Sequence, residues 1–302
     1  MQPGRKSSGI RIGSDRLVDR PAARVVAEVL CGTSGQWSSS SGQPTFRGRE
    51  VKSHASTIPV CFVSDLHLFS RRSSAHRIEG QIIGAAQRSR VCVLGGDIFD
   101  FKWSSHDSLQ ASLTAAVEWL KKLVERVPEC QFHFVLGNHD DHPELVALLP
   151  ILATQYTNFY WDRFYLRLGD ALFLHGDAAD RRMSVEHLRM RRDHFIHDPR
   201  KRWAHNLYGF VVGSQMHRLI PHAVYPRGIV ADRLLKYLHE IGHGPESGVR
   251  QVCFGHTHRP VSNYHRGGIT FHNGGAPIGR ANYRIIEIQV ATPPEGEVPS
   301  PE

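Results

Sequence analysis

Five short segments of this 302-residue chain carry side chains that bind divalent metal ions. Each segment contains Asp, Asn or His, and each follows a run of apolar residues that predicts a buried strand. Polar residues at the ends of neighbouring strands meet at one edge of a sheet. The five segments are Asp65-Leu66-His67, Gly96-Asp97-Ile98-Phe99-Asp100, Gly137-Asn138-His139-Asp140, His175-Gly176-Asp177 and Gly255-His256-Thr257-His258.

These donor groups suit a pair of hard to borderline cations, because they are carboxylate, amide and imidazole groups without a thiolate. Hydrolysis of a phosphate ester needs a nucleophile aimed at phosphorus, neutralised phosphoryl oxygens and help for the leaving group. Two divalent ions about 3.5–4 Å apart supply most of this by lowering the pKa of a bridging water and by holding the oxygens. The inventory therefore predicts a two-metal phosphoesterase in which a bridging hydroxide attacks the substrate.

In their order the five segments resemble the sequence blocks of the calcineurin-like metallophosphoesterases, over about residues 58 to 290. The resemblance implies that His139 contacts the phosphoryl group or protonates the leaving oxygen, with Asp140 orienting its ring. Asp100 would be an outer carboxylate that tunes the metal ligands. Mn²⁺ is the ion that the resemblance favours, although the same donors accept Fe, Zn, Co or Ni. The implied ligands are Asp65, His67 and His258 for one ion, Asn138, His175 and His256 for the other, and Asp97 for both.

Each segment taken alone has an ordinary structural interpretation. Gly-Asn-His-Asp is also typical of a turn at a strand end. The alternation in His256-Thr257-His258 would point the two rings to opposite sides of a strand, unless the chain bends there. The order of all five segments, each after an apolar run, favours the metal site.

The sequence around the segments predicts an α/β fold. Strands at 58–64, 91–95 and 131–136 alternate with helices near 75–89 and 107–127 and after Asp141, which argues for crossover units around a central sheet. Asp107 is the predicted N-cap of the second helix, and Pro143 suits the first turn of the third. Short strands at 164–168, 171–174, 250–254, 260–264, 268–272 and 283–290 predict hairpins of a second sheet. We therefore expect a two-sheet β-sandwich flanked by helices, the metallophosphoesterase fold.

The domain is expected to span residues 57–290 and to include a helical cap insertion at 178–248 above the active rim. Met183 to Arg191, Leu207 to Leu219 and Val230 to Ile241 are compatible with helices. The basic, Ser- and Gly-rich residues 1–56 and the tail 291–302 are expected to be disordered.

The formal net charge of +8 is concentrated outside the predicted metal-binding scaffold. Residues 1–57 carry nine Lys and Arg against four Asp and Glu, and residues 178–248 carry twelve against seven. Nucleic acid is therefore not the expected partner, because a protein of that class concentrates positive charge on its binding face. The arginines of the insertion have two interpretations: a solvated helix face, or capture of an anionic substrate or an anionic membrane surface.

The segment Gly255 to Pro260, the His175 segment and the basic helical insertion resemble the UDP-2,3-diacylglucosamine diphosphatase branch of the family. That resemblance implies cleavage of a pyrophosphate in a UDP-diacylglucosamine-like lipid. A soluble broad-specificity phosphodiesterase, phosphatase or nuclease is the alternative, since Gly96 to Asp100 also resembles a block of DNA repair nucleases. A metal-free scaffold would lack ligands, yet all seven positions are filled.

The five cysteines are odd in number and scattered, which does not suggest a disulfide framework. No apolar run approaches the length of a membrane span, and the start of the chain lacks the pattern of a secretory signal. We therefore expect a cytoplasmic protein, with peripheral contact to a membrane as the interpretation that the arginines leave open. No oligomeric state is predicted.

Overall fold

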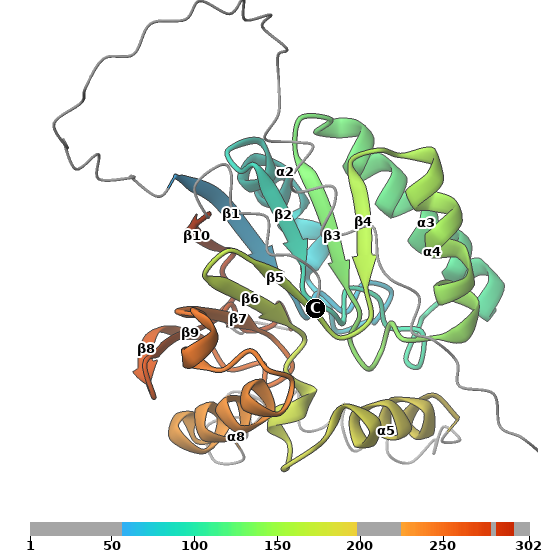
Figure 1. Ribbon diagram of the computed structural model, residues 1–302. Helices are drawn as coiled ribbons and strands as arrows, with labels where there is room; N and C mark the ends of the chain where they lie inside the picture. The colour runs from blue at the N-terminus through green and yellow to red at the C-terminus, as the bar shows by residue number, and fades with distance from the viewer. Residues whose placement is uncertain (1–55, 198–224, 279–281, 293–302) are drawn as a thin grey trace, which may run out of the picture. The chain divides into compact units, whose positions relative to one another are not determined.

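The first sheet carries three of the five segments at the ends of its strands. A computed structural model describes residues 56–197, 225–278 and 282–292. In the first sheet β1, β2, β3 and β4 run parallel, and β10 pairs antiparallel with β1 (Figure 1). The strand order is β10-β1-β2-β3-β4. The strands are β1 Thr57–Val63, β2 Val91–Leu94, β3 Gln131–Val135, β4 Phe159–Asp162 and β10 Ile286–Ala291.

The second sheet carries the other two segments, which follow β6 and β7. Its strand order is β5-β6-β7-β9-β8, and β6, β7 and β9 run parallel. The hairpins β5–β6 and β8–β9 form its two edges, as the sequence predicts. The strands are β5 Tyr165–Leu168, β6 Ala171–Leu174, β7 Gln251–Phe254, β8 Val261–Arg266 and β9 Ile269–Asn273.

Three helices cover the outer face of the first sheet. Side chains alternate along β1, so that Cys61 and Val63 pack with these helices whereas Val60 and Phe62 pack against the second sheet. The helix α3 contributes Leu113 and Leu120 from its apolar stripe. These elements are η1 Ala75–Arg77, α2 Glu79–Gln87, α3 Leu109–Arg126 and α4 Pro143–Gln155.

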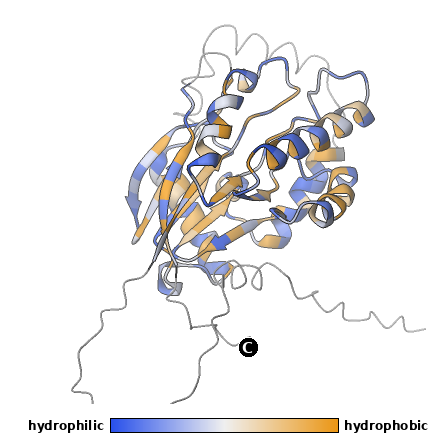
Figure 2. Ribbon diagram, turned by 90° about the horizontal axis from the view of Figure 1, so that it is seen from above, coloured by the Kyte–Doolittle hydropathy of each residue, from blue (hydrophilic) through white to orange (hydrophobic). Residues whose placement is uncertain are grey.

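The outer face of the second sheet is covered by helices from the predicted insertion. Leu234 and Leu238 of α8 (Arg227–Glu240) share a buried cluster with Leu172 and Val252 of the sheet, and Leu188 of α5 (Val185–His197) joins it. The layers are therefore helix, sheet, sheet and helix, with hydrophobic residues along the inner strands (Figure 2). The remaining short turns are η2 Asp177–Ala179 and η4 Pro245–Ser247.

The predicted two-sheet sandwich is confirmed, with differences in pairing and in the ends of elements. The strand expected at 283–290 belongs to the first sheet, where Ile288 pairs with Val60, and β10 reaches Ala291. β4 was not predicted; it is a four-residue strand whose pairing with β3 depends on distant residues. The strands β6, β7 and β9 are joined by crossovers and not by hairpins.

Parts of the sequence-based interpretation lie outside the described residues. They include the helix expected at Leu207 to Leu219 and nearly all of the two segments expected to be disordered. Of the helices that the structure describes, none has the length and hydrophobicity to cross a bilayer.

The N-cap of α3 is Ser108 and not the predicted Asp107. Ser108 has extended backbone angles, and its side chain accepts a hydrogen bond from the amide of Ala111. Both residue types favour this position, so the sequence alone does not separate them. We expect Ser108→Ala to lower the free energy of unfolding by about 1 kcal/mol, because that amide loses its partner. Urea denaturation checks this, with Asp107→Ala as the matched control; a larger loss in the control would contradict the assignment.

Candidate metal centre

The five segments meet where the parallel strands of both sheets end. Asp65 follows β1, Asp97 follows β2 and Asn138 follows β3, whereas His175 and His256 follow β6 and β7 of the second sheet. The backbone joins the ends as well, because the amide of Asp65 donates to the Gly96 carbonyl and that of Gly255 to the His175 carbonyl. The edge predicted from the sequence is therefore a shared edge of two sheets.

One group of donor atoms gathers around Asp65, His67 and His258. The Nε2 atoms of His67 and His258 lie 3.0 Å apart, and His258 Nε2 lies 3.6 Å from Asp65 Oδ1. Asp97 Oδ2 approaches from the other side, 3.9 Å from His67 Nε2. These are the residues that the resemblance implies for the first ion.

A second group gathers on the opposite side of the same carboxylate. Asn138 Oδ1 lies 3.2 Å from His175 Nε2 and 3.1 Å from His256 Nδ1, and the two ring nitrogens are 3.3 Å apart. Asp97 Oδ2 lies 3.3 Å from His175 Nε2. The structure thus brings all seven predicted ligands together in two groups that share Asp97.

Both groups fit a divalent ion. Imidazole and carboxylate ligands bind such ions at about 2.0–2.2 Å, so neighbouring ligand atoms around one ion lie about 3–3.6 Å apart. The separations here start at 3.0 Å and reach 3.9 Å. Asp65, His67 and His258 lie within 4.8 Å of one another through single ligand atoms, as do Asp97, His175 and His256. Oxygen and nitrogen donors at these distances could hold two divalent ions.

The backbone bends sharply at five of the seven residues. Asp65, His67, Asp97, His256 and His258 have φ angles between 46° and 65°, in the left-handed region that non-glycine residues rarely adopt. Such conformations cost of order 1–3 kcal/mol each and persist only where the surroundings impose them. Here they turn both rings of the His256 segment toward the centre. The strand-like alternation expected from sequence does not apply.

Two glycines let the backbone approach the carboxylates. A Cβ atom at Gly137 would lie 2.2 Å from Asp97 Oδ1, and one at Gly255 would lie 2.2 Å from Asp65 Oδ2. Both positions lack room for a side chain while the carboxylates hold their places.

Partners outside the two groups orient the rings. His175 Nδ1 faces the carbonyl oxygen of Gly95 at 3.2 Å, and a carbonyl can only accept, so this nitrogen donates. His256 Nε2 donates in the same way to Asp180 Oδ1 at 2.8 Å. When each ring is neutral, its other nitrogen therefore turns a lone pair toward the donor group, the tautomer that metal binding requires.

His139 lies beside the shared carboxylate, and it forms a further group of donors with His67 and Asp97, whose single ligand atoms all lie within 4.8 Å of one another. Its Nδ1 is 2.9 Å from Asp100 Oδ1, its Nε2 is 4.0 Å from Asp97 Oδ2, and the Phe195 ring packs on it at 4.7 Å between centroids. Asp100 therefore orients this ring, and its other oxygen lies 3.6 Å from His67 Nδ1.

Asp140 does not orient His139, and that part of the expectation is wrong. Its carboxylate accepts hydrogen bonds from the amides of Ile98, Phe99 and Gly137. It thereby ties the loop after β2 to the loop after β3. Asp140 fixes the position of Asp97 through the backbone, since two of these amides belong to the residues that directly follow Asp97.

The charges around Asp97 favour its ionised form. Burial would raise the pKa of Asp97, but His175 and His139 hold it well below its usual range. Burial would likewise lower the pKa of both histidines; Asp97 raises that of His175 to about 10, and Asp100 and Asp97 raise that of His139 to about 9. His258 behaves differently, because burial and the neighbouring His67 hold its pKa well below the usual value.

A cavity of about 280 Å³ opens onto the centre, and two of the residues that line it, Asp180 and Tyr225, were missed by sequence reasoning. Asp180, Arg191 and Tyr225 line it together with Asp97 and His139. Asp180 and Arg191 come from the insertion, whose charged residues showed no pattern beyond a basic face. The sequence offered one signal for Asp180: it is a second acidic residue, three positions after Asp177.

Ion binding is expected to release protons. A ligand histidine must be neutral, whereas a pKa of about 10 keeps His175 protonated at pH 7. The affinity for Mn²⁺ should therefore rise between pH 6 and pH 9, by about tenfold per pH unit for each proton released. Calorimetry in buffers of different ionisation enthalpy measures the released protons. Heats that do not depend on the buffer would contradict this expectation.

The sequence is similar to one protein family. The family model described as calcineurin-like phosphoesterase matches residues 58–260, a span that holds all seven predicted ligands. No curated protein matches the sequence. Among solved structures the chain is similar to a dimetal phosphatase from Danio rerio, with 12% sequence identity, a TM-score of 0.39 and coverage of 78% of this chain and 99% of that one. The family match covers well over half of the chain, which therefore belongs to the calcineurin-like phosphoesterases and is a metal-dependent phosphoester hydrolase.

Proposed function

We propose that the chain hydrolyses a phosphodiester or pyrophosphate bond with two divalent ions, Mn²⁺ in the first instance. One observation carries the proposal: the two groups of donor atoms share the Asp97 carboxylate, with Asp97 Oδ2 3.3 Å from His175 Nε2 and 3.9 Å from His67 Nε2. Asp65, His67 and His258 would hold one ion, and Asn138, His175 and His256 the other. When bound, such a pair activates water and neutralises the phosphoryl oxygens.

His139 is placed to hand a proton to the leaving oxygen. In the metal-free protein Asp100 and Asp97 raise its pKa to about 9 against the effect of burial, which keeps the ring protonated at neutral pH. Asp100 holds Nδ1, so that Nε2 is the atom that faces the shared carboxylate and the cavity. A general acid needs this combination of position and protonation.

The walls of the site suggest a substrate with an organic group beside the phosphate. A second cavity of about 160 Å³ adjoins the first at Asn138, His139 and Phe195, and its wall includes Phe101, Leu109 and Ile196. Arg191 lines the first cavity and can bind a further anionic group. The apolar wall and the nearby arginine together support a UDP-diacylglucosamine-like lipid as one candidate substrate. Residues 198–224 of the predicted insertion lie outside the described residues.

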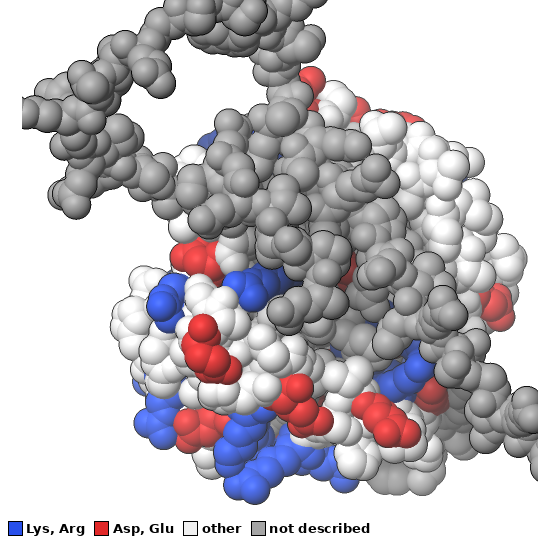
Figure 3. All heavy atoms as spheres, viewed as in Figure 1, with Lys and Arg blue, Asp and Glu red and all other residues white. Residues whose placement is uncertain are grey.

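Charge on the visible face speaks against a long nucleic acid. Lys and Arg lie among Asp and Glu over the region of α5 and α8 (Figure 3). Arg266 pairs with Asp232, and Arg191 pairs with Asp180. A basic stripe would be expected for extended nucleic acid binding. The alternative is a soluble broad-specificity phosphodiesterase or phosphatase. The range of substrates that the protein hydrolyses distinguishes the two candidates.

A hydrolysis screen tests the proposal. The purified, Mn²⁺-loaded protein is assayed on phosphate monoesters, small diesters, nucleotide pyrophosphates and a UDP-diacyl-sugar, with Asp97→Asn as the inactive control. The proposal predicts turnover of diesters or pyrophosphates that chelation removes and Mn²⁺ restores. Turnover of monoesters alone, or an equally active Asp97→Asn protein, would refute it.

Replacement of His139 should depend on the leaving group. We expect His139→Ala to reduce kcat by about 10²–10⁴-fold on esters of poorly acidic alcohols, because these need protonation, and to reduce it far less on p-nitrophenyl esters. Steady-state rates over a series of leaving groups measure the difference. Phe195→Leu is the control for altered packing on the ring. Equal losses over the whole series would argue against the acid role.

A further inference from the structure

Asp180 lies where three separate parts of the chain meet at the candidate metal centre. Its Oδ1 accepts hydrogen bonds from His256 Nε2 at 2.8 Å and from the Tyr225 hydroxyl at 2.7 Å, and its Oδ2 forms an ion pair with Arg191. The side chain is only 12% exposed. His256 and Tyr225 are remote from Asp180 in sequence, whereas Arg191 belongs to the helix α5 that follows the turn.

The contact with His256 fixes which nitrogen of that ring faces the donor group. A carboxylate accepts hydrogen bonds only, so Nε2 carries the proton and Nδ1 is left as a lone pair. Nδ1 lies 3.1 Å from Asn138 Oδ1 and 3.3 Å from His175 Nε2. Without Asp180 the ring could rotate or carry its proton on Nδ1, and either change would remove one ligand of the second group.

The same turn anchors the helix α5. Asp177 and Asp180 both belong to the turn that follows the predicted ligand His175. Arg192 is fully buried and donates from Nε and Nη2 to the two oxygens of Asp177, at 2.8 and 2.9 Å, while its neighbour Arg191 reaches Asp180. Two adjacent arginines of α5 thus hold the two carboxylates of one turn.

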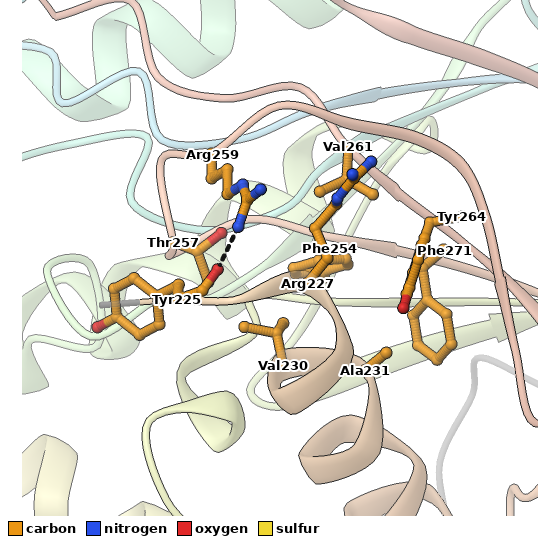
Figure 4. Close-up of a pocket in the computed structure, with 10 residues that line it drawn as sticks. All are labelled: Tyr225, Arg227, Val230, Ala231, Phe254, Thr257, Arg259, Val261, Tyr264 and Phe271. Carbon is orange, nitrogen blue, oxygen red and sulfur yellow. Dashed lines mark hydrogen bonds between the residues drawn. The ribbon is translucent and has the colours of Figure 1, made fainter. Parts of the chain in front are cut away.

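Tyr225 connects the turn at Asp180 to the segment that follows β7. Its backbone carbonyl accepts a hydrogen bond of 2.8 Å from Arg259 Nη1, one residue beyond His258 (Figure 4). The Tyr225 hydroxyl reaches Asp180, so the contacts run from the His256 segment through Tyr225 and Asp180 back to His256. These contacts restrain the ring of His256 through Asp180.

We propose that Asp180 is a positioning residue that holds His256 as a ligand of the second ion and links that ion to the docking of α5. This inference rests on the proposed function, because it needs a second ion at Asp97, Asn138, His175 and His256. Outer carboxylates that orient a ligand histidine typically change metal affinity by about 10–100-fold. No activity measurement is required to detect such a change.

Binding of Mn²⁺ to the metal-free full-length protein tests the proposal. Equilibrium dialysis with metal counting gives the affinities of both sites, and electron paramagnetic resonance detects a coupled pair of Mn²⁺ ions. The variants are Asp180→Ala, which removes the acceptor, and Asp180→Asn, whose amide oxygen can still accept the proton of Nε2. Asp232→Ala is the matched control, since Asp232 lies on α8 and forms an exposed pair with Arg266 of β8.

We expect Asp180→Ala to weaken one of the two sites by about 10–100-fold, to leave the other unchanged and to abolish the coupled spectrum at low Mn²⁺. Asp180→Asn should lie closer to wild type, and Asp232→Ala should bind as wild type. Wild-type affinities in Asp180→Ala, equal weakening of both sites, or identical behaviour of the Ala and Asn variants would overturn the role of Asp180. A wild-type protein that binds fewer than two ions would instead refute the proposed function.

Discussion

The site depends on one buried carboxylate that must face two groups of ligands at once. Asp97 can do so because its backbone is held in the left-handed region and because Gly137 leaves no side chain in its path. The amide of His139 donates to its Oδ1 at 2.8 Å, and the loops on either side are tied together by Asp140. A shift of this carboxylate would displace both groups together. The main role of the surrounding contacts is therefore to fix the position of Asp97.

Both sheets position donor groups of the site. Neither sheet alone holds a complete set of donors, since His175, His256 and His258 come from the second sheet and Asp65, Asp97 and Asn138 from the first. The core between the sheets, which includes Phe62 and Phe173, therefore sets the distance between the halves of the site. The left-handed residues store strain at the edge, and the buried layers behind them supply the stability that offsets it.

Local patterns in the sequence predicted the five donor segments, because a buried strand shows an apolar run and its polar end follows at once. The individual ligands were implied by the resemblance to the family. Local patterns predicted less where the structure depends on contacts between residues that are far apart in the sequence. The pairing of Ile286–Ala291 with β1, the short β4 and the choice of Ser108 over Asp107 depend on packing that no periodicity encodes. The role of Asp140 was misassigned because its partners are backbone amides. Asp180 could not be found from charge pattern alone, since its partners His256 and Tyr225 come from two remote segments.

The most direct test of this account is a crystal structure of the Mn²⁺-loaded protein with anomalous scattering recorded at the manganese edge. The account predicts two anomalous peaks about 3.5–4 Å apart, each within bonding distance of an oxygen of Asp97. The peak farther from His67 should lie against His256 Nδ1. A single peak, or two peaks that do not share Asp97, would contradict the central claim.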